Sequence, residues 1–171
     1  MKYLSPLPSI REGRFLILMK GFSMNKETPD NIEELKRKAN NKSNWRDRLS
    51  AVNELRDYDC QQSRDILTRL AIHDPVFKVK EAAFQAAQAM EITKDGQPIR
   101  LTKMPKGNLI KGIQDKLQKT RDVLPDDYSL EDFKLAFKNK YPIAYDTYEG
   151  SKGDQFDKWL MNVTKNLKKK S

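Results

Sequence analysis

The sequence predicts an all-α protein, in which a short solenoid of α-hairpins is followed by a C-terminal three-helix subdomain. Three observations support this prediction. Seven glycines in 171 residues are few for a β-barrel or a β-sandwich. Apolar residues recur at the three- and four-residue spacing of helices along most of the chain. An internal repeat, in which position 45 corresponds to position 77, indicates stacked copies of one helical unit.

Residues 1–23 are expected to be a non-native or disordered N-terminal extension. The stretch "MKGFSM" corresponds to codons that contain an AAAGG-like ribosome-binding sequence just before Met24. The hydrophilic stretch "MNKETPDNIEEL" that follows is typical of a cytoplasmic start. We therefore expect Met24 to be the natural initiator and residues 1–23 to be poorly packed.

Residues 24–91 are predicted to form the helical repeat region, with four helices. The first helix follows Thr28 and Pro29, which suit an N-cap and a first helical position, and it ends near Ala39. The other three helices are indicated by one apolar face each. These faces consist of Trp45, Leu49, Val52 and Leu55, of Ile66, Leu67, Leu70 and Ala71, and of Val76, Val79, Ala83, Ala86 and Met90.

Two of these helices match one another position by position. Trp45 corresponds to Phe77 and Arg48 to Lys80, and the small and apolar positions that follow also agree. The stretch "DPVFKVKEAAFQAA", and more loosely "NWRDRLSAVNEL", resembles the HEAT-repeat family, whose second helix follows an Asp-Pro turn and has a valine, a basic residue and an alanine-rich face. The resemblance covers about residues 44–91 and implies stacked α-hairpins. The alanines would let neighbouring helix axes approach closely.

Residues 92–105 contain a glycine and two prolines and are predicted to be a linker or a short extended excursion. Residues 106–171 are predicted to form a basic C-terminal helical subdomain with three helices. Ser129 and Asp132 have the spacing of a capping box at the start of one of them. The stretch "YEGSKGD" is interpreted as a connector before the last helix. The apolar stripes consist of Leu109, Ile113 and Leu117, of Leu130, Phe133 and Phe137, and of Phe156, Trp159, Leu160, Val163 and Leu167.

The net charge of +9 is unevenly distributed along the chain. Residues 1–43 have a net charge of +4, residues 44–98 of −1 and residues 99–171 of +6. This asymmetry suggests an acidic partner, with nucleic acid first, although a lysine-rich composition also serves solubility. The candidate phosphate or partner contacts are Lys103, Lys106, Lys111, Lys152, Lys158, Lys165, Lys168, Lys169 and Lys170.

The chemistry-bearing residues argue against several classes of function. One cysteine, Cys60, rules out an internal disulfide, and together with a single histidine, His73, it argues against a zinc site or Cys/His catalysis. We assign no catalytic, cofactor-binding or metal-binding residue and expect no cofactor and no small-molecule substrate. No segment approaches the ~20 apolar residues that cross a bilayer, so we expect a cytoplasmic protein without a membrane partner.

The function expected from the sequence is that of a non-enzymatic binding or adaptor protein in the bacterial cytoplasm. The first expected partner is a protein that is bound by the surface of the HEAT-like helical repeat. The alternative is non-specific nucleic-acid binding through the basic C-terminal helices, where lysines contact phosphates without reading sequence. A third hypothesis follows from the resemblance, since some HEAT-like proteins are DNA glycosylases. No residue of this chain matches a motif of that group.

Overall fold

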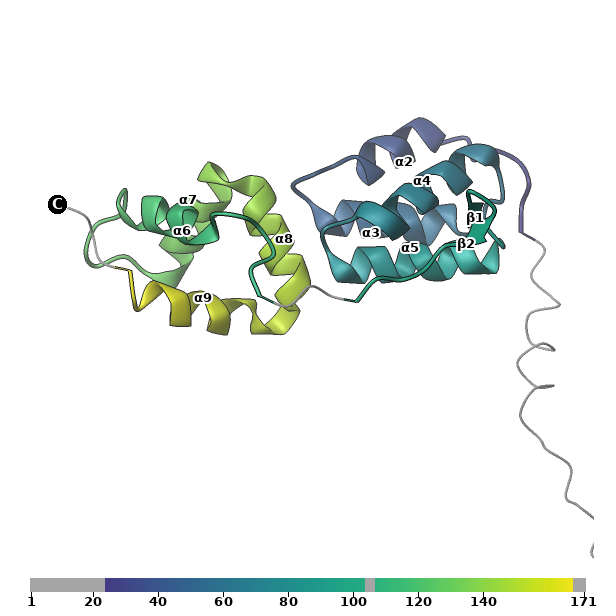
Figure 1. Ribbon diagram of the computed structural model, residues 1–171. Coiled ribbons are helices and arrows are strands. Elements are labelled where there is room, and N and C mark those ends of the chain that lie inside the picture. Colours follow the sequence, from purple (N-terminus) through teal and green to yellow (C-terminus); the bar gives the residue numbers. More distant parts are fainter. Residues whose placement is uncertain (1–23, 104–106, 168–171) are drawn as a thin grey trace, which may run out of the picture.

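The computed structural model describes residues 24–103 and 107–167 (Figure 1). The expectations for residues 1–23, for Lys106 and for Lys168, Lys169 and Lys170 concern residues outside this part of the chain. The described residues are mostly helical, with one small β-hairpin, so the predicted all-α fold is confirmed. They form two helical units, each with its own hydrophobic core, which lie side by side in Figure 1.

The N-terminal unit contains two helical hairpins. Helices α2 (Ile32–Ala39) and α3 (Trp45–Leu55) form the first, and α4 (Gln61–His73) and α5 (Phe77–Ala89) form the second. Helix α3 packs against α5, and α2 packs against α4, so the hairpins are stacked in register. The first helix begins later than predicted, because the chain around Asn25 pairs with residues 57–59 and the backbone then turns at Pro29.

The alanine-rich face of α5 is buried because this helix has neighbours on several sides. Helix α5 contacts α4, α3 and, from the C-terminal unit, α8 (Pro142–Lys152). Ala83, Ala86 and Ala87 are buried, whereas Ala89 is exposed. Small side chains at the buried positions let three helices approach one central helix. The core face predicted for α5 is confirmed, because the five residues that make up this face are all buried. They are Val76, Val79, Ala83, Ala86 and Met90.

The segment after α5 forms a β-hairpin on the N-terminal unit. Helix α5 ends with Glu91 in a left-handed conformation (φ 52°), and the Ile92 N–H donates to the Ala87 carbonyl (2.9 Å), as in a Schellman motif. Strands β1 (Thr93–Lys94) and β2 (Gln97–Pro98) are joined by Asp95 and Gly96, which both have positive φ and suit a type I′ turn. The flanking isoleucines, Ile92 and Ile99, are buried in the core of this unit.

The C-terminal unit contains one helix more than the three that were predicted. It comprises α6 (Ile113–Arg121), α7 (Leu130–Lys140), α8, the short 3₁₀ helix η1 (Gly153–Gln155) and α9 (Phe156–Thr164). The interpretation of "YEGSKGD" as a connector was therefore wrong, because Tyr148–Lys152 belong to α8. Helix α8 packs against its own unit and against α3 and α5, so it shows no one-sided apolar stripe. The predicted capping box of Ser129 and Asp132 is confirmed at the start of α7.

Candidate binding groove across the two helical units

A buried ion-pair network joins the two helical units. The Arg48 guanidinium on α3 donates to both carboxylate oxygens of Asp74, with Nε at 2.8 Å from Oδ2, and to Asp146 Oδ2 on α8 at 3.0 Å. It also donates to the Asn41 carbonyl at 2.7 Å. All three ionic side chains are almost fully buried. Since α8 supplies Asp146, this network fixes the C-terminal unit on the stacked hairpins.

Asp146 in this network titrates differently from an exposed aspartate, chiefly because it is buried. Burial raises the pKa of Asp146, and the nearby Asp74 carboxylate raises it further, while Arg48 and the Trp45 backbone N–H lower it in part. The hydrogen bonds and attraction from Asp74 outweigh burial and hold the pKa of Arg48 above its ordinary value. Arg48 therefore stays charged, whereas Asp146 takes up a proton at a higher pH than an exposed aspartate does.

A second set of contacts fixes α8 close to its C-terminal end. The Trp45 indole Nε1 donates to Glu149 at 3.1 Å, and Arg46 Nη1 donates to the same carboxylate at 2.7 Å. Gly150 lies directly against Trp45 and Val76, where a Cβ atom would come within 2.8 Å of both side chains. The close approach therefore requires glycine at this position of α8.

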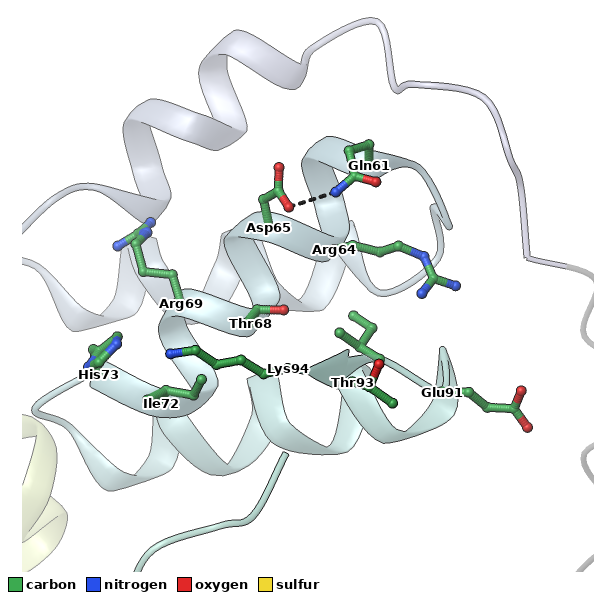
Figure 2. A pocket seen from close by; sticks show the side chains of 11 residues that line it. Gln61, Arg64, Asp65, Thr68, Arg69, Ile72, His73, Glu91, Thr93 and Lys94 are labelled. Carbon is green, nitrogen blue, oxygen red and sulfur yellow. Dashed lines mark hydrogen bonds between the residues drawn. The ribbon is translucent and has the colours of Figure 1, made fainter. Parts of the chain in front are cut away.

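A hollow with a volume of about 520 Å³ lies between α4 and the β-hairpin (Figure 2). We call it the α4 hollow. Arg69 and His73 lie at one end of it, and Glu91 lies at the other. The Lys94 side chain extends from β1 along α4 toward the end with Arg69 and His73.

Two further hollows continue from the α4 hollow to the C-terminal unit. The central hollow, about 260 Å³, shares Arg69 and His73 with the α4 hollow and is also lined by Lys42 and by Ile143 of α8. The α8 hollow, about 370 Å³, shares Ile143 with the central hollow and is lined by residues around the start of α8. The remaining residues that line the α8 hollow are Ile110, Lys116, Lys140, Tyr141, Pro142 and Ala144. We call the three adjoining hollows together the groove.

The junction between the units forms part of this groove. Arg48 and Asp74, the centre of the ion-pair network, also line the central hollow. Ile143 is 51% exposed although it is a large apolar residue, and it is the second residue of the helix that carries Asp146. The network thus holds Ile143 at the point where the central and α8 hollows meet.

The lysines proposed from the sequence are not gathered in this groove. Lys103 lines a separate small hollow beside Lys80, which shares Asp74 and Pro75 with the central hollow. The Lys152 ammonium lies over the rings of Trp159 and Tyr148, at 5.2 and 6.0 Å from their centres. Lys111, Lys158 and Lys165 are exposed near α6 and on or after α9.

The C-terminal helices also have less positive charge than the sequence count suggested. Residues 107–167 contain ten basic and ten acidic side chains. The excess of +6 in residues 99–171 therefore comes from residues 99–106 and 168–171, which flank these helices. A charge count over a long stretch of chain did not reveal which surface is basic.

Sequence reasoning missed the residues that line the groove because they come from six separate segments. Lys42 precedes α3, Arg69 is on α4, Lys94 is on β1, and Ile143 is on the helix that was not predicted. One local pattern was informative: Asp95-Gly96 between short extended stretches is typical of a hairpin and would have placed Lys94 on a strand. No pattern along the chain brings Lys42 close to Ile143.

Comparison with known proteins gives no further guide to the site, since no family model, curated protein or solved structure matches this chain. Residues 24–103 and 107–167 contain no cluster of three or more His, Cys, Asp or Glu side chains arranged to hold a metal ion. Within the same part of the chain, every helix is too short or too polar to span a bilayer.

Proposed function

We propose that the protein is a non-enzymatic binding or adaptor protein of the bacterial cytoplasm, which holds a segment of a partner protein in the groove. The observation that carries this proposal is the continuity of the groove, since Arg69, His73 and Ile143 each line two adjoining hollows. A groove that crosses two units offers a long contact surface, which suits a chain segment better than a compact small molecule.

The stacked hairpins support the HEAT-like part of the proposal. Two hairpins stacked in register are what a short solenoid requires, and the groove begins on α4 of the second hairpin. Solenoid repeats present extended surfaces to their partners because each repeat contacts only its neighbours. The C-terminal unit then extends the surface through α8 instead of adding a third hairpin.

Nucleic-acid binding through the C-terminal helices has weaker support. Residues 107–167 have equal numbers of basic and acidic side chains, so the helices themselves offer little attraction to phosphates. Lys152, one of the proposed phosphate contacts, is positioned over two aromatic rings of its own unit.

The proposal is tested by selecting peptides from a random library displayed on phage, with the full-length protein immobilised. We expect peptides to be enriched and their binding to weaken at least about tenfold in Ile143→Asp, because this substitution places a charge where two hollows meet. Leu135→Asp is the matched control: Leu135 on α7 is also a large exposed apolar residue, 61% against 51% for Ile143, and does not line the groove.

Two results would contradict the proposal. The first is a selection that enriches no peptide. The second is a set of peptides that bind wild type, Ile143→Asp and Leu135→Asp equally, since such peptides do not occupy the groove. Circular dichroism of both variants shows whether they remain folded.

A further inference from the structure

We propose that the segment held in the groove is an extended, acidic peptide with apolar side chains, which adds to the free edge of β1. This inference rests on the proposed function, because it assigns chemistry to a partner that the groove must first bind. Three features of the groove carry it: unpaired positive charge, apolar lining and one open strand edge.

Positive charge without an ion-pair partner lines the whole length of the groove. Within residues 24–103 and 107–167, five basic side chains that line the three hollows form no ion pair. These side chains are Lys94 and Arg69 in the α4 hollow, Lys42 and again Arg69 in the central hollow, and Lys116 and Lys140 in the α8 hollow. Each hollow therefore offers a cation to a carboxylate of the ligand.

Other basic residues of the groove are already neutralised. Arg64 pairs with Asp59, and Arg48 pairs with Asp74 and Asp146. Among the described acidic residues that line the groove, Asp65 and Glu91 form no ion pair, and both line the α4 hollow. The positive excess is consequently greatest in the central and α8 hollows, and we expect the acidic residues of the ligand to lie there.

The lining of the groove favours a peptide over a nucleic acid. Apolar residues accompany the cations in each hollow, including Ile72 in the α4 hollow, Leu70 in the central hollow and Ile143 in the last two. Single-stranded nucleic acids bind through bases stacked on aromatic rings. Among the described residues that line the groove, Tyr141 is the only Phe, Tyr or Trp, and the Lys116 ammonium already lies 4.9 Å from its ring centre.

The open edge of β1 indicates an extended ligand backbone. The two-residue turn closes on the pair Lys94↔Gln97, which exchanges the ladder hydrogen bonds, so the peptide groups of Thr93 point away from β2. Thr93 lines the α4 hollow, and these groups are available to a strand that lies in it. On the opposite edge of the hairpin, Pro98 lacks an N–H, which disfavours strand addition there.

The experiment uses the peptides selected on the full-length protein and two triple variants. The groove variant, Lys42→Glu with Lys94→Glu and Lys140→Glu, reverses one exposed lysine in each hollow. The control variant, Lys111→Glu with Lys158→Glu and Lys165→Glu, changes the total charge equally with exposed lysines outside the groove. Affinities are measured by fluorescence anisotropy near physiological salt, where distant charges are screened.

We expect the enriched peptides to combine acidic and apolar residues. The groove variant should weaken their binding at least about tenfold, and the control variant by less than about twofold. N-methylation of the peptide backbone should weaken binding at one or two positions, where a peptide N–H pairs with Thr93.

The outcomes separate this inference from the proposed function. Enriched peptides that are neutral or basic, or that lose equal affinity in both triple variants, overturn the inference and leave a peptide-binding groove. Insensitivity to N-methylation at every position overturns strand addition to β1. A single-stranded oligonucleotide that displaces the peptides, and that the groove variant no longer binds, shows a nucleic-acid site instead. Failure to enrich any peptide removes the proposed function and this inference together.

Discussion

The two helical units differ in the side chains that fill their cores. The core of the N-terminal unit is aliphatic and alanine-rich, and its aromatic residues Trp45 and Phe84 are only partly buried. The core of the C-terminal unit is built on aromatic rings, with Phe133 and Phe137 fully buried among tyrosines. Neighbouring ring centres there are 4.5–6.4 Å apart.

This difference shows two solutions for packing short helices. Alanines allow the helices of the stacked hairpins to approach closely, so their core is thin and regular. The C-terminal helices have nine to eleven residues each, and large aromatic rings fill the space between them. The two solutions meet at α8, where a buried ion-pair network accompanies the close packing of Gly150 on Trp45 and Val76. The predictions below test the junction first and then the stacked hairpins.

The largest expected effect comes from Arg48→Met, which breaks the junction between the units. The substitution leaves Asp74 and Asp146 buried without their cation, and we expect it to lower the free energy of unfolding by about 3–5 kcal/mol. Chemical denaturation followed by circular dichroism measures this change. We also expect hydrogen exchange to quicken at the contacts of α8 with α3 and α5. A loss below about 1 kcal/mol would show that packing alone holds the units together.

A smaller effect is expected from Ala83→Leu in the stacked hairpins. Ala83 is fully buried on the face of α5 that packs against neighbouring helices, so a larger side chain should cost about 1–3 kcal/mol through overpacking. Ala89→Leu on the same helix is the matched control, because Ala89 is exposed and the change there should be close to neutral. Equal melting temperatures for the two variants would contradict the explanation given for the alanines.

The N-terminal unit was easier to predict from the sequence than the C-terminal unit. The buried positions of α3, α4 and α5 are mostly apolar and recur at helical spacing, so the core was found. Helix α8 buries Asp146, Thr147 and Tyr148 in succession because it has neighbours on more than one side. Asp146 accepts hydrogen bonds from the Trp45 N–H and from Arg48, about 100 positions away, and no local pattern reports such partners.

The candidate site could not be predicted for a related reason. The sequence identified lysines by their density along the chain, whereas the groove depends on lysines that folding brings together, such as Lys42 and Lys140. It also depends on the pairing of other basic residues, since Arg48 and Arg64 line the groove but are neutralised by aspartates. Both facts become known only once the contacts of the folded chain are known.

The pH dependence of Asp146→Asn tests the charge balance of the junction. Burial raises the pKa of Asp146, so the folded protein takes up this proton at a higher pH than the unfolded chain does. Protonation of Asp146 therefore stabilises the folded protein. This stabilisation is present in full below the pKa of an aspartate in the unfolded chain, about 4, and is lost as the pH rises through the pKa of Asp146 in the folded protein. Asparagine cannot titrate. We expect about 1 kcal/mol of destabilisation near neutral pH from weaker bonding to Arg48.

Denaturation at several pH values between neutral and about 4 measures this difference. As the pH falls through the range just above the ordinary aspartate pKa, the wild type should gain stability relative to the Asn variant. The other titrating groups occur in both proteins, so they largely cancel in the comparison. A difference that moves in the opposite direction would mean that attraction from Arg48 outweighs burial at Asp146.

The smallest expected effect, and the one stabilising substitution, is Glu91→Gly at the end of α5. Glu91 has a φ of 52°, in the left-handed region that disfavours L side chains, and it occupies the position that glycine prefers in a Schellman motif. Glycine there should raise the free energy of unfolding by up to about 1 kcal/mol. Glu81→Gly, within the same helix, is the matched control and should lower it by about 1 kcal/mol.

Because Glu91 also lines the α4 hollow, its removal takes away one negative charge from a groove proposed to bind acidic peptides. Glu91→Gly should thus stabilise the fold without weakening peptide binding, and a thermal melt with a parallel anisotropy titration measures both. Loss of binding in a stabilised variant would show that Glu91 contacts the ligand directly.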